Sequence, residues 1–330
     1  MPFQEFRKRF PKTADYLQRN RDKLEQRRDS RQLVSSRGNW HGLVRYSSWD
    51  VIKSPKIVTQ GIVRHSEFCI DDGGYAFIGK GVSAIVPTRV DIHYLTALLN
   101  SKLLEFYLRC ICPIKQGGYY TCAISYLDQV PVRRIIDRPH HTKGTRERHT
   151  AERLYQRFLA EAHPACVLAH VEHQLAQKPE HGHVVHDLLA YLAEQMIAMN
   201  CEKQQEVTGF LKWLERKIGA AVDDLANKTR LRSYHEHDLD GLLEVLRQNH
   251  RKLEIDTDAR AVQEAIDREF SKSLEKLTPL KAKIAATDRL IDQIVYRLYG
   301  LTPEEIAIVE GTSAGEVGEE DPTSIAAPPE

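Results

Sequence analysis

The chain has 330 residues and a net charge of +1, and 42% of its residues are hydrophobic. Because this length exceeds what a single hydrophobic core usually holds, we expect more than one domain. No apolar run reaches transmembrane length and no secretory signal is present. A chain of this size does not need disulfide bonds for stability, although it has six cysteines. We therefore expect a cytoplasmic protein.

The small net charge conceals a strong asymmetry along the chain. Residues 1–150 hold 26 Lys and Arg against 14 Asp and Glu, which gives +12, and residues 151–330 hold 21 against 32, which gives −11. The positive half suits a polyphosphate partner, because its cations would steer the partner and release counterions on binding. The negative half is poorly suited to lie along DNA, so we expect it to face protein or solvent.

The first elements predicted are one helix and then short strands. Thr13 can cap a helix that runs to about Arg28, and we assign residues 1–30 to a linker helix. Short runs of β-forming residues follow at 43–46, 56–63, 67–70, 75–78 and 82–86. The Asp-Asp-Gly-Gly sequence at 71–74 permits the positive φ that a tight hairpin needs.

An amphipathic helix is predicted over residues 91–109. Leucines and aromatic residues recur there at steps of three and four and form one apolar face: Tyr94, Leu95, Leu98, Leu99, Leu103, Phe106 and Tyr107. After a basic linker at 137–150, helical spacing recurs at 152–161, 184–200, 206–226, 238–250 and 259–299, and Gly300 is placed to end the last helix. Residues 311–330 are acidic and poor in large apolar side chains, so we expect a disordered tail.

The cysteines and histidines do not suggest a metal site. Cys110 and Cys112, followed by Cys122, lack a paired CxxC motif and an evident fourth ligand, so buried small side chains are the better interpretation. No carboxylate or cysteine completes a recognisable site around the histidines of the helical half, which we expect at the surface: His163, His170, His173, His181, His183 and His186.

Eight segments resemble, in order, parts of a known family. They are PKTADYLQRNRDKLEQR at 11–27, WHGLVRY at 40–46, SPKIV at 54–58, EFCIDDGGYAF at 67–77, YLTALLNSKLLEFYL at 94–108, QGGYY at 116–120, LDQVPV at 127–132 and DRLIDQIVYRLYGLTPEEIAIVEG at 288–311. Over about residues 10–311 the chain resembles the C-terminal specificity region of Type IIG restriction-modification methyltransferases, including those grouped as TaqI-like, and related phage-defence adenine methyltransferases.

The resemblance implies a domain that reads a DNA sequence while a catalytic domain flips out an adenine and methylates its exocyclic amine. Such a catalytic domain needs a glycine turn for S-adenosylmethionine and an Asn/Asp-Pro-Pro-Tyr/Phe loop for the flipped base. Residues 79–81, Gly-Lys-Gly, come nearest to the first, and the only Pro-Pro lies at 328–329. No convincing acidic nuclease cluster is evident either. We therefore expect no catalytic residue, no metal and no cofactor in this chain, which would be a separate subunit, a split gene product or a truncated fragment.

Candidate DNA contacts come from the basic half. In the segment KQGGYY the glycines let backbone N–H groups approach a phosphate, and Gln can pair with adenine through two hydrogen bonds. The tyrosines can stack on a base or donate a hydrogen bond. Alternatively, the two tyrosines fill the domain core. Its residues are Lys115, Gln116, Gly117, Gly118, Tyr119 and Tyr120. Arg45 is a further candidate, beside Trp40, which is more typical of a core anchor. Candidate phosphate contacts, each with a solvated surface as the alternative, are Lys53, Lys56, Lys80, Lys102, Arg133 and Arg134.

The predicted fold class is α+β, with a mixed target-recognition domain over 31–136 and an all-α helical bundle over 151–310. The predicted function is recognition of double-stranded DNA for a restriction-modification or phage-defence adenine methyltransferase system, with a methyltransferase or Type II endonuclease subunit in trans and no activity of the chain alone. One alternative is that the chain is itself part of an active adenine-N6 DNA methyltransferase. Another is a non-catalytic helical interaction module. The apolar stripe over residues 274–298 is more typical of a packed helix than of an open partner surface.

Overall fold

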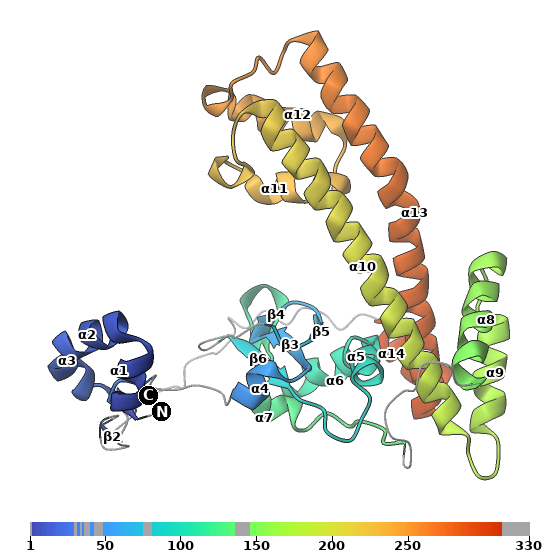
Figure 1. The fold of residues 1–330 in the computed structure, drawn as a ribbon. Coiled ribbons are helices and arrows are strands. Elements are labelled where there is room, and N and C mark those ends of the chain that lie inside the picture. The colour runs from blue at the N-terminus through green and yellow to red at the C-terminus, as the bar shows by residue number, and fades with distance from the viewer. Residues whose placement is uncertain are drawn as a thin grey trace, which may run out of the picture. The chain divides into compact units, whose positions relative to one another are not determined.

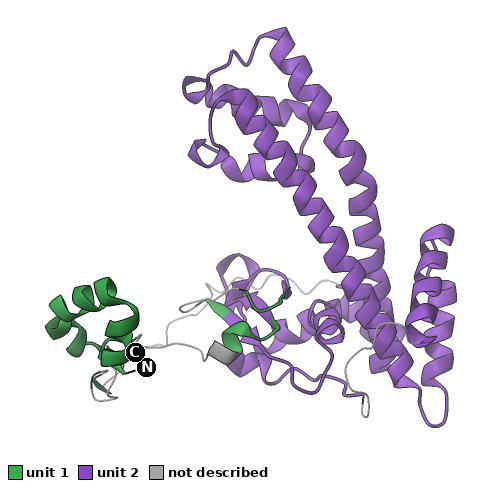
Figure 2. Cartoon of the chain, viewed as in Figure 1, with its two compact units in different colours: residues 1–56, 71–82 green, residues 57–70, 83–330 purple. Residues whose placement is uncertain are grey.

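The computed structural model describes residues 2–29, 32–33, 35, 40–42, 49–74, 81–135 and 146–311. It is an α+β molecule of small sheets and long helices, which confirms the predicted fold class (Figure 1). Two compact units divide the chain: unit 1 comprises residues 1–56 and 71–82, and unit 2 comprises residues 57–70 and 83–330 (Figure 2). None of the helices in the described ranges has the length and hydropathy of a membrane span.

Unit 1 begins with three short helices in place of the single predicted one. Its described elements are α1 (Phe3–Arg9), α2 (Pro11–Arg19), α3 (Arg21–Glu25), the antiparallel pair β1 (Arg28–Asp29) and β2 (Gln32–Leu33), and α4 (Trp49–Lys53). The prediction that Thr13 caps a helix was wrong, because Thr13 lies inside α2. That helix begins at Pro11, and proline suits a first turn because its missing N–H would have no partner there.

Aromatic and arginine side chains pack the start of unit 1. The rings of Phe3 and Trp40 lie 4.7 Å apart, and the guanidinium of Arg21 lies 5.1 Å from the centre of the Trp40 ring. Arg27 donates a hydrogen bond of 2.6 Å to the carbonyl of Trp40. Trp40 therefore packs against its neighbours, but it is only partly buried.

Within the ranges that the structure describes, six further short strands form two three-stranded sheets. The strands are β3 (Lys56–Gln60), β4 (Ile62–Val63), β5 (Cys69–Asp71), β6 (Val82–Ile85), β7 (Ile114–Lys115) and β8 (Tyr119–Thr121), in the orders β5-β3-β6 and β4-β8-β7. The predicted run 56–63 is thus broken at Gly61 into strands of different sheets. The predicted runs 43–46 and 75–78 lie outside the described residues. At the predicted turn, Gly73 has φ +102°, and a Cβ there would lie 2.0 Å from the carbonyl oxygen of Lys53, so only glycine fits.

Two helices occupy the segment for which one was predicted. They are α5 (Ile92–Leu99) and α6 (Lys102–Ile111). Asp91 caps the first by accepting two backbone hydrogen bonds of 2.8 and 3.0 Å, and Ser101 caps the second. Between them, the Asn100 amide makes two hydrogen bonds of 2.9 Å with the backbone of Phe68. The apolar pattern continues across the break and therefore could not reveal it.

The remaining described elements of unit 2 are helices. Its helices are α7 (Ile124–Leu127), α8 (Arg146–Glu161), α9 (Ala165–Leu175), α10 (Gly182–Ile218), α11 (Lys228–Arg232), α12 (Leu239–Gln248), α13 (Arg260–Tyr299) and α14 (Pro303–Val309). The predicted break between 200 and 206 is absent, because that stretch of α10 contains no glycine or proline. Helix α8 begins inside the segment 137–150 that the sequence assigned to a linker. Gly300, with φ +70°, ends α13 as predicted.

Three cores hold unit 2 together. The sheet core joins both sheets to α5 and α6, and includes Ile57, Phe68, Leu95, Leu99, Tyr120 and Cys122. The base core joins α5 to α8, α9, α10 and α13, and includes Tyr94, Leu98, Leu104, Tyr155, Leu189 and Ile294. The tip core joins the other ends of α10 and α13 to α11 and α12, and includes Phe210, Leu214, Tyr234, Leu246, Phe270 and Leu277. Helices α10 and α13 therefore run antiparallel, side by side, through two separate cores (Figure 1), which confirms that the apolar stripe of α13 is largely packed.

Candidate nucleic-acid interface

Two exposed loops of unit 2, residues 64–66 and 115–118, are joined by side chains of α6. The carboxylate of Glu105 accepts hydrogen bonds from the backbone N–H of Ser66 (3.1 Å) and from Arg109 Nε (2.9 Å), and it pairs with His65 Nδ1 at 3.2 Å. Arg109 also donates to the carbonyls of Gly118 (3.3 Å) and Arg64. The two loops therefore form one exposed surface, the loop surface: Arg64, His65, Lys115, Gln116, Gly117, Gly118 and Tyr119.

The ionised form of Glu105 is what holds this arrangement. Burial acts to raise the pKa of Glu105, but hydrogen bonds from the Ser66 N–H, Arg109 and His65 outweigh it, and the pKa is lowered. The resulting carboxylate can bind Arg109 through charge-assisted hydrogen bonds. Arg109 is thus oriented toward both loops by a charge that persists at neutral pH.

The two glycines give the second loop its shape. Gly117 and Gly118 have φ of +78° and +76°, in the left-handed region that other residues rarely adopt. Strands β7 and β8 pair on either side of them, with Lys115 opposite Tyr119. The loop is therefore a tight connection with exposed backbone, which allows its N–H groups to approach a phosphate closely.

The neighbouring tyrosines of the loop have different environments. Tyr120 is fully buried in the sheet core, its hydroxyl lies 3.1 Å from Ser66 Oγ, and burial raises its pKa to about 12. Tyr119 points the opposite way, as alternate strand residues do, and 43% of its surface is exposed. The core interpretation thus holds for Tyr120, which has no surface to offer DNA, and Tyr119 remains available for contact.

Burial also corrects the interpretation of Lys56. Its side chain is fully buried in unit 1, donates a hydrogen bond of 2.7 Å to the carbonyl of Ile52, and forms an ion pair with Asp71. The hydrogen bond from Lys56 lowers the pKa of Asp71, and the N–H groups of Gly73 and Gly74 lower it further. Lys56 therefore supports the turn at 71–74 and is not free to contact a phosphate.

The other predicted phosphate contacts are scattered. Lys53 is exposed at the end of α4 in unit 1, and Lys102 is exposed in the first turn of α6 in unit 2. Arg133 is half-buried and makes a two-pronged ion pair with Glu180, at 2.6 and 2.7 Å, whereas Arg134 is exposed. Arg45 and Lys80 lie outside the described residues. Of the predicted set, only residues 115–119 are thus shown to share one exposed surface.

Sequence reasoning missed the contribution of Arg64, His65 and Glu105. The two loops are some fifty residues apart in the chain, and they meet because β4 pairs with β8, placing Ile62 opposite Thr121. The only local signal was a basic pair directly after a β-type run.

The cysteines show no metal-binding arrangement. Cys112 and Cys122 are buried, as predicted, but Cys110 is exposed on α6, so the prediction of burial was wrong for that residue. Across the ranges that the structure describes, no group of three or more His, Cys, Asp or Glu is arranged to hold a metal ion.

Comparison with known families covers two segments of the chain. Residues 7–132 match the TaqI-like C-terminal specificity domain, and residues 186–295 match a domain of unknown function, DUF8810. No curated protein and no solved structure matches the chain. The first match contains the whole loop surface, and it supports a DNA-recognition role in restriction-modification, in which a specificity domain works with a catalytic partner. Residues 7–132 are therefore similar to a TaqI-like C-terminal specificity domain, and they are called the specificity domain below.

Proposed function

We propose that this chain reads a sequence in double-stranded DNA through the loop surface, on behalf of an adenine methyltransferase of a Type IIG or phage-defence system. The observation that carries the proposal is the joining of the two loops by Glu105 and Arg109 inside the segment that matches a specificity domain. An exposed loop of glycine, lysine and glutamine on a packed sheet combines backbone donors, charge and a base-reading amide.

The residues of the loop surface divide by chemistry. Gln116 is exposed, and its amide can donate and accept at one adenine edge. Lys115 and Arg64 are exposed cations beside it, and phosphate contacts need only charge and reach. Tyr119 can stack or donate a hydrogen bond. Lys53, Lys102 and Arg134, which are not part of the loop surface, are further candidates for phosphate contacts.

Catalysis belongs, in this proposal, to a partner polypeptide in the cytoplasm that carries the S-adenosylmethionine site and the base-gripping loop. The sequence offers neither motif. Isothermal titration calorimetry of the purified chain with S-adenosylmethionine should show no binding, and labelled cofactor should not transfer methyl groups to DNA. Measurable cofactor binding would show that the chain holds a catalytic site of its own.

The DNA contacts can be tested by selecting duplexes from a randomised library with the full chain. Gln116→Ala should lose the preference among selected duplexes at one position, because a two-pronged base contact contributes about 1–3 kcal/mol of discrimination. Lys115→Ala should weaken all duplexes alike and reduce the steepness of the log-log salt dependence by about 0.9. Gln204→Ala, on the exposed surface of α10, is the matched control and should change nothing.

Two results would overturn this assignment. Binding by the wild-type chain that does not weaken with salt would remove the DNA role, since phosphate contacts release counterions. Unchanged relative affinities in folded Gln116→Ala would move the base-reading residues to another part of the specificity domain.

A further inference from the structure

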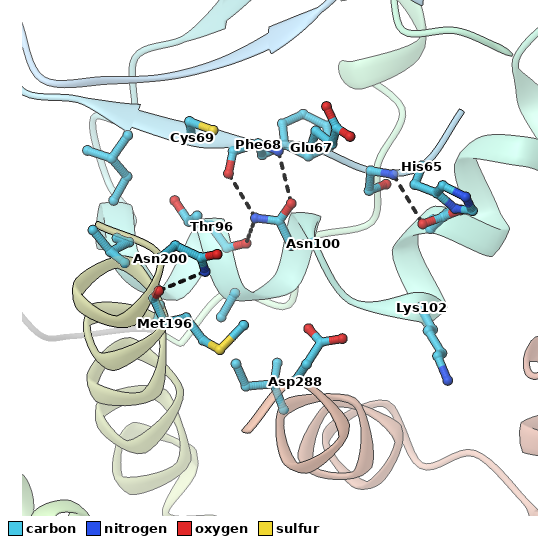
Figure 3. A pocket seen from close by; sticks show the side chains of 17 residues that line it. His65, Glu67, Phe68, Cys69, Thr96, Asn100, Lys102, Met196, Asn200 and Asp288 are labelled. Atoms are coloured by element: carbon cyan, nitrogen blue, oxygen red, sulfur yellow. Dashed lines mark hydrogen bonds and ion pairs between the residues drawn. The ribbon is translucent and has the colours of Figure 1, made fainter. Parts of the chain in front are cut away.

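A pocket of about 740 Å³ lies in unit 2 where α10 and α13 pass the specificity domain (Figure 3). Residues 65–70 form one wall, together with the facing sides of α5 and α6, and side chains of α10 and α13 form the other. Its walls therefore come from both of the segments that match family models, 7–132 and 186–295. A molecule in this pocket would contact both at once.

The interior of the pocket is apolar. Ala97, Met196 and Ile291 line it, and Ile197 stands at its edge with 41% of its surface exposed. A partner side chain that entered the pocket could pack against these residues and remove their exposed apolar surface from water.

Two polar side chains of the pocket wall, Asn100 and Thr96, are already engaged. The Asn100 amide bonds both backbone groups of Phe68 at 2.9 Å and also the carbonyl of Thr96 at 3.1 Å. The Thr96 hydroxyl donates to the carbonyl of Ile92 at 2.7 Å. A nucleobase or polar metabolite would need directed hydrogen bonds from the interior. Asn100 and Thr96 cannot supply them, so this wall of the pocket offers mainly apolar contact.

The edge of the pocket carries carboxylates. Glu67 is exposed, and the side chain of Asp288 projects from α13 toward the space between the walls (Figure 3). Lys102 lies on the same edge and Glu105 is engaged by Arg109 and the loop at 64–66. Exposed carboxylates repel a phosphate backbone and attract a cationic side chain. With Glu105 engaged, Glu67 and Asp288 still outnumber Lys102 on this edge, so its charges favour a cationic side chain over a phosphate group.

We propose that the pocket receives a segment of the catalytic partner polypeptide that presents a large apolar side chain next to a lysine or arginine. The inference rests on the proposed function, because it requires a partner in trans. The apolar side chain packs against Met196 and Ile197, and the cation lies beside Glu67. The partner is thereby held to the specificity domain and to the helices together.

The test is a selection of phage-displayed random peptides on the full chain, followed by fluorescence anisotropy with the enriched peptides as the probes. Enriched peptides should share an apolar residue adjacent to Lys or Arg. Ile197→Glu should weaken their binding about tenfold or more, as expected for a central contact, and Glu67→Lys should weaken it several-fold. Ile308→Glu, at a 52% exposed isoleucine of α14, is the matched control and should have no effect.

Three outcomes would overturn the proposal: no enrichment, enriched peptides that bind Ile197→Glu as well as wild type, or displacement of the peptides by duplex or single-stranded DNA. Failure of the proposed function would look different, because it would abolish DNA binding by the wild-type chain. Binding of duplex DNA to Ile197→Glu, measured by gel shift, should equal that of wild type, which separates the pocket from the loop surface.

Discussion

The base core and the tip core are held by the same two helices, yet they differ in what those helices pack against. In the base core, α10 and α13 pack against α5, which belongs to the specificity domain. In the tip core, their described packing partners are α11, α12 and the turns between them. One end of the matched segment 186–295 therefore packs against the specificity domain, and the other end forms a core of its own.

Helix α5 explains why the base core and the specificity domain are packed together. Leu95 and Leu99 pack in the sheet core, whereas Tyr94 and Leu98 pack in the base core, so the helix is buried on two sides. A helix that is apolar nearly all round must be covered on all sides to be stable in water. The specificity domain thus depends on α10 and α13 for part of its own core.

The charges of the second half are also unevenly placed. Residues 151–300 hold 21 Lys and Arg against 24 Asp and Glu, a net charge of −3, whereas residues 301–330 hold eight acidic residues and no Lys or Arg. The helices of the base and tip are therefore close to neutral, and most of the predicted negative charge belongs to the final thirty residues. Charge alone does not distinguish the base from the tip.

The largest effect is expected when a buried leucine of either core is replaced by aspartate. Leu98→Asp places a carboxylate in the base core and should destabilise it by more than about 4 kcal/mol, because a buried unpaired charge is among the costliest substitutions. It should also abolish DNA binding. Leu246→Asp makes the equivalent change in the tip core and should leave DNA binding intact, since both leucines are fully buried but only Leu98 belongs to the specificity domain, where it lies in the base core. Hydrogen exchange and gel shifts report the two effects, and loss of DNA binding in Leu246→Asp would show that the tip is not self-contained.

The second prediction concerns pH at the base. Asp292 is buried on α13, and one of its oxygens accepts a 2.8 Å hydrogen bond from the backbone N–H of Lys102 at the start of α6. The pKa of Asp292 is raised to about 7, chiefly by burial. The hydrogen bond from the Lys102 N–H lowers this pKa, and the negative charge of the nearby Asp288 raises it further. In the unfolded chain the group titrates near its ordinary value of about 3.9. The folded state therefore binds more protons between about pH 4 and pH 7, and stability falls as pH rises through that window, by about 4 kcal/mol in total.

Asp292→Asn should remove this dependence. The free energy of unfolding of the variant, minus that of wild type, should be larger at about pH 8 than at about pH 5. The reason is that the amide does not lose a proton as the pH rises. Thermal unfolding across this range measures the difference. Asp240→Asn, at an exposed aspartate of α12 in the tip, is the control and should follow the wild-type curve. An unchanged pH profile in Asp292→Asn would contradict the prediction.

The smallest effect concerns a feature that the two cores share. The Tyr155 hydroxyl lies 2.8 Å from Thr287 Oγ1 in the base, and the Tyr234 hydroxyl lies 2.6 Å from Ser273 Oγ in the tip, so α13 offers a buried hydroxyl to each core. Tyr155→Phe and Tyr234→Phe should each destabilise by about 1 kcal/mol, the usual net contribution of one hydrogen bond. Hydrogen exchange should show increased exchange in α5 only for Tyr155→Phe. Equal exchange in both variants would mean that the cores are coupled through α13.

Much of the helical half was readable from local pattern. The 3.6-residue spacing and Gly300 located α13, and residues 238–250 located α12, because amphipathic periodicity and a left-handed terminal glycine are local properties. The break between α5 and α6 was not readable, because it depends on a hydrogen bond between Asn100 and Phe68, which is distant in sequence. The same limit applies to Lys56, whose burial depends on Asp71.

The candidate site divides in the same way. The sequence by itself determined the composition of the loop at 115–119 and the resemblance to a specificity domain, since residue type and order carry that information. Only the tertiary structure decided that Tyr120 faces inward, that Glu105 and Arg109 join this loop to residues 64–66, and that α10 and α13 complete the core of the specificity domain. Those decisions depend on strand pairing and helix packing between segments far apart in the chain, which no local periodicity specifies.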